Sequence, residues 1–275
     1  MLLAIDIGNT NIVAGVFGGL TLSRSWRIGT KLDRTADEYA LILGGLFSAA
    51  ELTRSVRRAV LSSVVPPLEA VLVEAVFRSF GVSTEVVKPG WKTGLTLDID
   101  RPDELGADRL VNAAAAFRRF GGPLVVVDFG TATTFCAVTA EGVYKGGAIL
   151  PGIEVSLDAL SARTAKLPRI PLAAPLRAIG TNTVTAMQSG IVYGTAELVD
   201  GLAARFGREL GGKPLGVATG GLAGVVARHC RSIREIVPDL TLEGLRLLFE
   251  MNCGMDKSKI KSRRSKKKTR GGGPK

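Results

Sequence analysis

The sequence has few of the residues that many catalytic and metal-binding motifs require. It contains one histidine, His229, and three cysteines, Cys136, Cys230 and Cys253, which form no CxxC pair. Because there is no second histidine, both a histidine-based catalytic triad and a histidine-rich zinc site are disfavoured. The cysteines are odd in number and widely spaced, which indicates reduced thiols, so we expect a cytoplasmic protein.

Longer signals are missing as well. No apolar run reaches the roughly 20 residues that a membrane-spanning helix needs, and the N-terminal MLLAIDIGN lacks the basic region of a secretory signal. Neither GxxxxGKS, GxxxxGKT nor GxGxxG occurs, which excludes a P-loop NTPase and the usual dinucleotide fingerprint. The 275 residues are 46% hydrophobic and 22% charged, as expected for a soluble chain of one large or two ordinary domains.

The net charge of +11 is concentrated at the C-terminal end. Residues 257–275 hold ten Lys and Arg and no acid, and the rest of the chain has 26 basic against 25 acidic residues. Such a segment, without apolar periodicity, predicts a disordered basic tail, which we place at residues 256–275. It can bind polyanions nonspecifically, so we expect no specific nucleic-acid partner and regard the tail as a dispensable extension.

What the chain does contain is a short pattern that occurs twice. AIDIGNTNIV at residues 4–13 and VVVDFGTATTF at 125–135 each end an apolar run in Asp-x-Gly and continue with Thr or Asn. Each copy predicts strand, glycine turn and strand, and helical spacing follows in both parts of the chain. The fold class is therefore α/β, with two duplicated halves and a cleft between them.

The other expected elements follow from apolar spacing and from Gly and Pro punctuation. Strands are predicted at 2–7, 12–17, 20–27, 57–65, 123–128, 132–139, 143–149 and 214–221, the last running into a glycine turn. Helices are predicted over 36–50, 67–80, 106–119, 182–208 and 241–252, with a bend in the fourth near Gly190 or Gly194.

The repeated turn suits phosphate chemistry. An aspartate that ends a buried strand beside a glycine turn points into the cleft that the strand ends line. Gly8 allows a tight turn and close approach of a ligand, and the Asn-Thr-Asn that follows offers donors for phosphate oxygens. Asp6 suits a hydrated Mg²⁺ that bridges phosphates. One such turn is common because Asp and Gly favour turns, but two at matching places indicate function.

Five motifs resemble those of type III pantothenate kinase, in family order and spacing over residues 1 to about 250: DIGNTN at the start, GADR at 106–109, DFGTATT at 128–134, GGAILPG at 146–152 and GTNT at 180–183. That family belongs to the superfamily of acetate and sugar kinases, Hsp70 and actin. The resemblance therefore implies two ribonuclease H-like, actin-like subdomains, which we place at residues 1–120 and 121–255. It also implies ATP-dependent phosphorylation of pantothenate to 4'-phosphopantothenate, the first step of coenzyme A biosynthesis.

The resemblance also implies roles for single residues. Asp108 would be the general base that accepts the proton of the pantothenate hydroxyl, Asp6 would position Mg²⁺ and phosphates, and Asp128 would bind a monovalent cation, K⁺ or NH₄⁺. The ATP site would comprise Asp6, Ile7, Gly8, Asn9, Thr10, Asn11, Ile12, Val13 and Thr131. The pantothenate site would comprise Gly106, Ala107, Asp108, Arg109 and Thr183. From the residues alone, Asp108 and Arg109 could equally form a charge pair at a helix start.

The resemblance implies a homodimer, in which the helix over 182–208, with small residues at Gly190, Gly194 and Ala196, would pack against its twin. One departure concerns Ile99, which stands where many members carry a tyrosine near pantothenate, and Trp91 is then the candidate aromatic wall. Two alternatives stay open: a non-catalytic relative that acts as a transcriptional accessory factor, and a kinase of another small alcohol.

Overall fold

The computed structural model describes residues 1–254, so the basic tail expected at 256–275 lies outside the described residues. Two β-sheets form its framework. The first contains β1 (Leu2–Ile7), β2 (Asn11–Gly18), β3 (Thr21–Gly29), β4 (Arg58–Ser63) and β5 (Thr84–Val86). The second contains β6 (Thr96–Leu97), β7 (Leu124–Phe129), β8 (Ala132–Val138), β9 (Val143–Pro151), β10 (Leu215–Thr219) and β11 (Ile233–Ile236).

The two sheets share one topology. Their strand orders are β3-β2-β1-β4-β5 and, read in the matching direction, β9-β8-β7-β10-β11, with β6 added at the outer edge of β9. In both, an antiparallel meander of three strands is followed by strands parallel to the first. The duplicated α/β fold expected from the repeated turn is thus confirmed.

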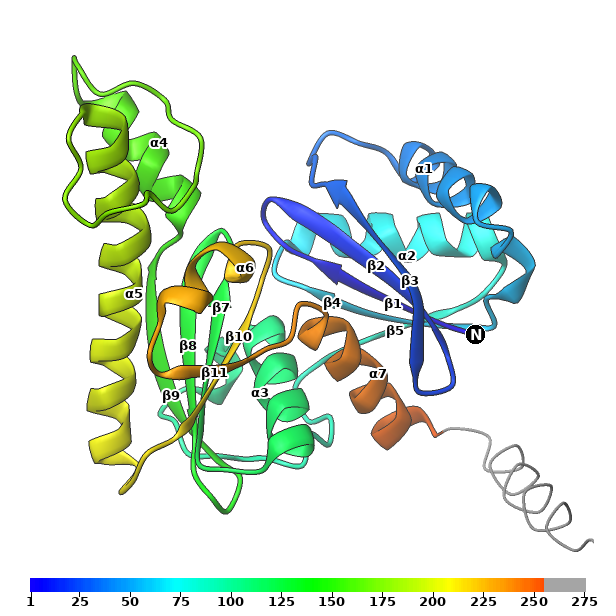
Figure 1. The fold of residues 1–275 in the computed structure, drawn as a ribbon. Coiled ribbons are helices and arrows are strands. Elements are labelled where there is room, and N and C mark those ends of the chain that lie inside the picture. The colour runs from blue at the N-terminus through cyan, green and yellow to red at the C-terminus, as the bar shows by residue number, and fades with distance from the viewer. Residues whose placement is uncertain (255–275) are drawn as a thin grey trace, which may run out of the picture.

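Helices cover both sheets (Figure 1). They are α1 (Ala36–Ala49), α2 (Pro66–Phe80), α3 (Ala107–Phe120), α4 (Ile153–Arg163), α5 (Thr183–Glu209), α6 (Ala223–Val226) and α7 (Leu240–Cys253). Three single 3₁₀ turns lie at Thr53–Ser55, Pro102–Glu104 and Ala227–His229. None of the helices within residues 1–254 is long and apolar enough to cross a membrane.

Side-chain alternation along β1 divides the first sheet into two packed faces. Leu3, Ile5 and Ile7 are fully buried in a cluster with residues of α1 and α2. Ala4 belongs to a different cluster, built with α7 and α3. Because successive side chains of a strand point to opposite faces, Asp6 lies on the Ala4 face, toward α7.

The second sheet repeats this division. Val125 and Val127 of β7 pack in a cluster with α5, whereas Leu124 and Val126 pack with α3. Asp128 continues the even-numbered set and therefore faces the α3 side. Both repeated aspartates consequently point toward the layer that holds α3 and α7.

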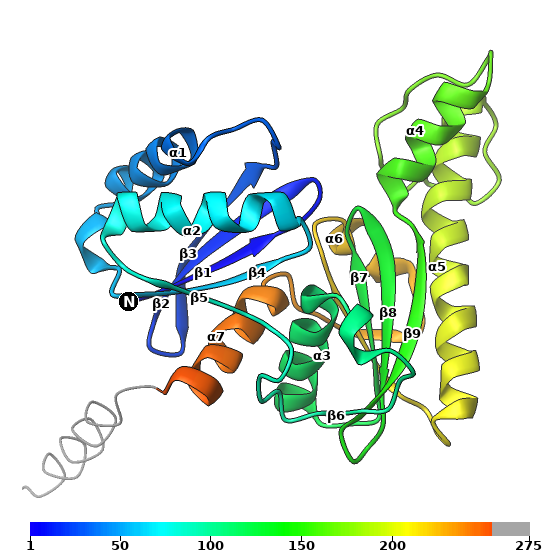
Figure 2. The same ribbon diagram turned by 180° about the vertical axis from the view of Figure 1, so that it is seen from behind.

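That middle layer joins the halves, since α3 and α7 pack against each other where the two sheets meet (Figure 2). Helix α3 precedes residue 121 but contacts β7 and β8 of the second sheet as well as β4, and α7 contacts β1, β2 and β4 of the first sheet. The first sheet thus packs against α7, which follows residue 121, and the second sheet packs against α3, which precedes it. The subdomain bounds 1–120 and 121–255 stay a prediction.

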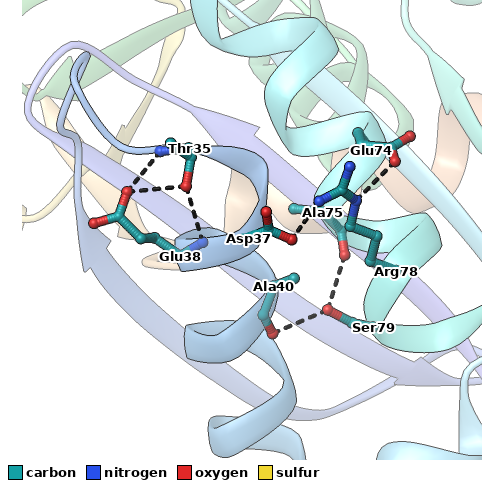
Figure 3. A network of polar contacts seen from close by, with 8 residues as sticks. All are labelled: Thr35, Asp37, Glu38, Ala40, Glu74, Ala75, Arg78 and Ser79. Carbon is teal, nitrogen blue, oxygen red and sulfur yellow. Dashed lines mark hydrogen bonds and ion pairs between the residues drawn. The ribbon is translucent and has the colours of Figure 1, made fainter.

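Polar contacts fix α1 against α2 on the outer face of the first sheet (Figure 3). Arg78 of α2 donates to Asp37 of α1 and pairs with Glu74 of its own helix at 2.8 Å. The Ser79 hydroxyl reaches the Ala40 carbonyl oxygen at 3.1 Å. These charged side chains are exposed, so each pair contributes little to stability, and the network mainly sets the orientation of the helices.

The elements expected from the sequence all form close to their expected bounds, and α5 continues through Gly190 and Gly194 as one unbroken helix. The short elements β5, β6, β11 and α6, and also α4, were not expected. Strands of two to four residues carry too little alternation to be recognised, and here they form because a neighbouring strand already offers its backbone groups.

Candidate active site

A cleft of about 340 Å³ lies between the two Asp-x-Gly turns and takes residues from both halves of the chain. The expected site residues that line it are Asp6, Gly8, Asn9, Thr10, Asn11, Val13, Asp108, Asp128 and Thr131. Three of them, Asp6, Asp108 and Asp128, are carboxylates that come from β1, the first turn of α3 and β7. The structure thus brings together both repeated aspartates and the aspartate of the GADR segment.

Asp6 is held by a buried hydroxyl. The Ser62 Oγ, which is fully buried at the end of β4, donates to Asp6 Oδ1 at 2.7 Å. The pKa of Asp6 is raised to about 7, chiefly by burial and to a smaller extent by the carboxylates of Asp108 and Asp128, against the opposing effects of the Ser62 hydrogen bond and the Arg27 charge. A carboxylate in such surroundings gains strongly from a bound cation.

Asp128 is held in the same way by an amide. Asn112 of α3 donates from Nδ2 to Asp128 Oδ2 at 3.0 Å, and the Thr241 hydroxyl of α7 donates to Asn112 Oδ1 at 2.7 Å. Burial, and then the Asp108 charge, raise the pKa of Asp128 to about 6. The two helices of the middle layer therefore fix the orientation of this carboxylate.

Asp108 lies in the first turn of α3, where its Oδ1 accepts the backbone N–H of Arg109 at 2.8 Å. Burial raises the pKa of Asp108 above its ordinary value, and the neighbouring Arg109 opposes the rise. The charge-pair alternative is not seen, because no ion pair joins the two side chains within residues 1–254. Arg109 instead donates from Nη2 to the Phe135 carbonyl at 3.3 Å.

The two turns touch across the cleft. The hydroxyl oxygens of Thr10 and Thr131 are 2.7 Å apart, although 121 positions separate them in the chain. The first turn is braced by Thr30, whose Oγ1 donates to the Gly8 carbonyl at 2.7 Å. Tyr39 of α1 fixes the next residue, since its hydroxyl donates to the Lys31 carbonyl at 2.9 Å. The position of the first turn is therefore set by α1 as well as by the sheet.

Two glycines leave room for the carboxylates. A Cβ at Gly220, where φ is +93°, would lie 2.4 Å from Asp128 Oδ1, and a Cβ at Gly106 would lie 2.6 Å from Asp108 Oδ1. Both distances are shorter than any real contact, and the positive φ at Gly220 favours glycine in any case. The ATGG turn at 218–221 therefore lies directly against the second Asp-x-Gly turn.

Other expected residues lie outside the cleft lining. The side chains of Ile7 and Ile12 are fully buried in the core of the first half, where they support the turn. Thr183 is exposed in the first turn of α5. Gly106, Ala107 and Arg109 begin α3 next to Asp108. Ile99, which replaces the tyrosine of many family members, and Trp91, the candidate aromatic wall, also lie outside the cleft lining. Ile99 packs in the α3 cluster of the second sheet and Trp91 in the α7 cluster of the first.

Sequence reasoning missed four residues that shape the site: Ser62, Asn112, Thr241 and Arg27. Ser62 lies directly opposite Asp6 in the pairing of β1 with β4, and Thr241 reaches the site only through the packing of α7 on α3. Each position depends on strand pairing or helix packing between distant segments. No local sequence pattern predicts these four residues, because their positions in the site follow only from the pairing and packing.

The sequence also matches a known family over most of its length. The pattern described as type III pantothenate kinase matches residues 2–205. The chain belongs to the type III pantothenate kinase family. A type III pantothenate kinase of Moorella thermoacetica is 50% identical over 254 residues, which covers 92% of this chain and 100% of that protein. Another, of Anaeromyxobacter sp. strain Fw109-5, is 51% identical over 253 residues with the same coverage.

Solved structures share the fold of this family member. A Campylobacter jejuni protein named for the Baf family of transcriptional activators superposes with a TM-score of 0.60 at 19% identity, covering 92% of this chain and 100% of that one. The activator of 2-hydroxyisocaproyl-CoA dehydratase from Clostridium difficile gives a TM-score of 0.51 at 14% identity, covering 99% of each chain. At such identities the likeness concerns the fold alone.

Proposed function

We propose that this protein transfers the γ-phosphoryl group of ATP to the primary hydroxyl of pantothenate, the first step of coenzyme A biosynthesis. The observation that carries the proposal is the convergence of Asp6, Asp108 and Asp128 in one cleft between two glycine turns. A chain about half identical to named type III pantothenate kinases over their whole length supports the choice of substrate.

Asp108 serves as the general base. The pantothenate hydroxyl oxygen attacks the γ-phosphorus, the bond to the β,γ-bridging oxygen breaks, ADP leaves, and the hydroxyl proton passes to an Asp108 oxygen. Burial raises the pKa of Asp108, which makes its carboxylate a better proton acceptor than an exposed one. Since its Oδ1 already accepts the Arg109 N–H, Oδ2 is the oxygen available for the proton.

The phosphates of ATP lie between the two turns, against the N–H groups and side chains of residues 8–11 and of Thr131. The Thr10–Thr131 contact marks where the turns meet, and their hydroxyls turn to phosphate oxygens when the nucleotide enters. The Clostridium difficile activator carries bound ADPNP, which supports nucleotide binding by this fold. Bound Mg²⁺ supplies charge neutralisation of the phosphates, and the cation-seeking Asp6 is the residue that would position it.

Asp128 holds the monovalent cation, K⁺ or NH₄⁺. Its carboxylate is partly buried and, within residues 1–254, receives one hydrogen bond, from the Asn112 amide, so a cation would relieve the cost of its charge. Within residues 1–254 no group of three or more His, Cys, Asp or Glu side chains could hold a metal ion. The cation therefore shares Asp128 with carbonyl, hydroxyl or phosphate oxygens.

Pantothenate occupies the side of the cleft near the start of α3, where Gly106, Ala107 and Arg109 adjoin Asp108. A contact from Thr183 stays a prediction, because Thr183 is exposed at the start of α5 and outside the cleft lining. Arg109 has a buried Nε without a partner within residues 1–254. An unpaired buried donor costs free energy, and the pantothenate carboxylate is a suitable acceptor once the pocket opens to it.

The assembly is a homodimer that works in the cytoplasm. Gly190 and Gly194 are exposed on α5 and leave open space beside it, which suits close packing of a second copy. Ala196 was expected on the same surface, but it is only 2% exposed and packs in the core of its own second half. Cys136, Cys230 and Cys253 are free thiols, as in a reducing compartment.

The test is ATP turnover by the purified protein with and without pantothenate and K⁺, with the product identified by mass. We expect ADP formation that needs both additions and a product heavier than pantothenate by one phosphoryl group. Faster turnover with a different alcohol would show that this alcohol, and not pantothenate, is the substrate. If no alcohol is phosphorylated while the nucleotide still binds, a non-catalytic role is favoured.

A further inference from the structure

The lining of the proposed nucleotide cleft contains a single positively charged side chain among the described residues. Four carboxylates line it, those of Asp6, Asp108, Asp128 and Asp239, and among the described lining residues Arg27 alone carries a positive charge. A triphosphate brings more negative charge than one Mg²⁺ neutralises, so a cleft of this composition needs a protein cation at the phosphates. The side chain of Arg27 is exposed and makes no hydrogen bond or ion pair within residues 1–254.

Strand register places Arg27 in line with the site. Asp6 pairs with Ser62 on one side and with Val13 on the other, and Val13 pairs with Arg27 of β3. Directly paired residues share a sheet face, so all four side chains point to the cleft side. Adjacent strands are about 4.8 Å apart, so the Arg27 backbone lies about 10 Å from that of Asp6 in the same row of the sheet.

The guanidinium also reaches the other half of the molecule. A Cβ at Gly221 would lie 3.3 Å from Arg27 Nη1 and 3.6 Å from its Nη2, so the guanidinium rests on the bare backbone of the Gly220–Gly221 turn. The positive charge of Arg27 lowers the pKa of both Asp6 and Asp128, so it acts on the carboxylates of both halves. Arg27 therefore extends from β3, in the first half, to the turn after β10, in the second.

We infer that Arg27 is the phosphate-binding cation of this cleft: it contacts the phosphate chain of the bound nucleotide and ties the first half to the Gly220–Gly221 turn. This inference rests on the proposed function only for the identity of the nucleotide. Arginine suits the task because its planar guanidinium offers two parallel donors to phosphate oxygens and keeps its charge at every working pH.

The test compares Arg27→Ala, Arg27→Lys and the control Arg24→Ala, whose arginine is on the same strand but does not line the cleft. Calorimetric titration at about pH 8.5, above the pKa of both Asp6 and Asp128, uses a non-hydrolysable ATP analogue with Mg²⁺, and also AMP. We expect Arg27→Ala to weaken the triphosphate about 10- to 100-fold and AMP much less, with a smaller loss in Arg27→Lys. The control should bind like wild type.

The outcomes separate this inference from the proposed function. If Arg27→Ala binds the triphosphate analogue like wild type, or loses AMP affinity equally, Arg27 is no phosphate contact, whatever the alcohol substrate is. If wild type binds the analogue with the expected Arg27 dependence but phosphorylates no pantothenate, the inference holds and the proposed reaction is wrong. A wild-type protein that binds no nucleotide overturns both.

Discussion

Replacing Asp6 with asparagine should stabilise the free protein while abolishing its activity. Asparagine keeps the shape of the side chain, and its Oδ1 can still accept the Ser62 hydroxyl that now lies 2.7 Å from Asp6. The change removes a carboxylate whose ionised form is disfavoured by burial and by the nearby Asp108 and Asp128 charges. Activity is lost because Asp6 positions the Mg²⁺ and phosphates in the proposed site.

The magnitude follows from the pKa of Asp6, which burial raises from 3.8 to about 7. A group whose pKa is raised in the folded state contributes stability below its unfolded pKa and loses it as the pH rises through the folded value. The wild type therefore loses stability between about pH 4 and pH 7, by at most about 4 kcal/mol at 1.36 kcal/mol per pKa unit. Since Asp6 is only partly buried, about 2 kcal/mol is the expected size.

The assay is thermal or denaturant unfolding of both proteins without ligand, at about pH 8 and about pH 4. Asp6→Asn should be the more stable protein at the higher pH, and the difference should vanish at the lower one. The matched control is Asp33→Asn, which changes an exposed carboxylate outside the cleft and should leave stability unaltered. A variant no more stable than wild type at pH 8 would refute the electrostatic reasoning.

Four further outcomes are expected. Asp108→Asn should fold and bind ATP but phosphorylate pantothenate at least about 100-fold more slowly, and near-wild-type turnover would remove its catalytic role. Ser62→Ala loses the hydrogen bond that lowers the pKa of Asp6, so the acidic limb of the kcat/KM profile should move up by about one pH unit, and an unmoved limb would contradict this. Light scattering at micromolar concentration should report a dimer, and a monomer would disprove the assembly. Deletion of residues 257–275 should keep the kinase activity and remove salt-sensitive binding to polyanions, whereas salt-resistant, sequence-selective binding that survives deletion would support a regulatory role.

The fold could be predicted wherever the chain itself carries the pattern. The apolar runs of β1 and β7 and the glycine turns after them identified both meanders, and the spacing in α2 and α5 identified those helices. The edge strands could not be found in this way, since β11 buries only Ile233 of its four residues. Its place is set by β10, whose backbone groups need a partner, and by the apolar cluster around α5.

The site residues that the sequence revealed are likewise those whose pattern lies within one continuous segment of the chain. Asp6 and Asp128 could be recognised because the duplication repeats the Asp-x-Gly turn, and the pairing now shows matching rows of side chains across the two sheets. In order, the rows are Ser62, Asp6, Val13 and Arg27 in the first sheet and Thr219, Asp128, Thr134 and Ile149 in the second.

The rows agree at the hydroxyl and the carboxylate and differ at the other two places, Val13 against Thr134 and Arg27 against Ile149. At the third strand of the meander the first half thus has a cation and the second an exposed isoleucine, 64% accessible. That strand lies beyond both copies of the repeated pattern, so the sequence comparison of the halves could not reach it. Duplication therefore explains why two carboxylates face each other across the cleft. The divergence of β3 from β9 explains why its positive charge comes from the first half alone, through Arg27.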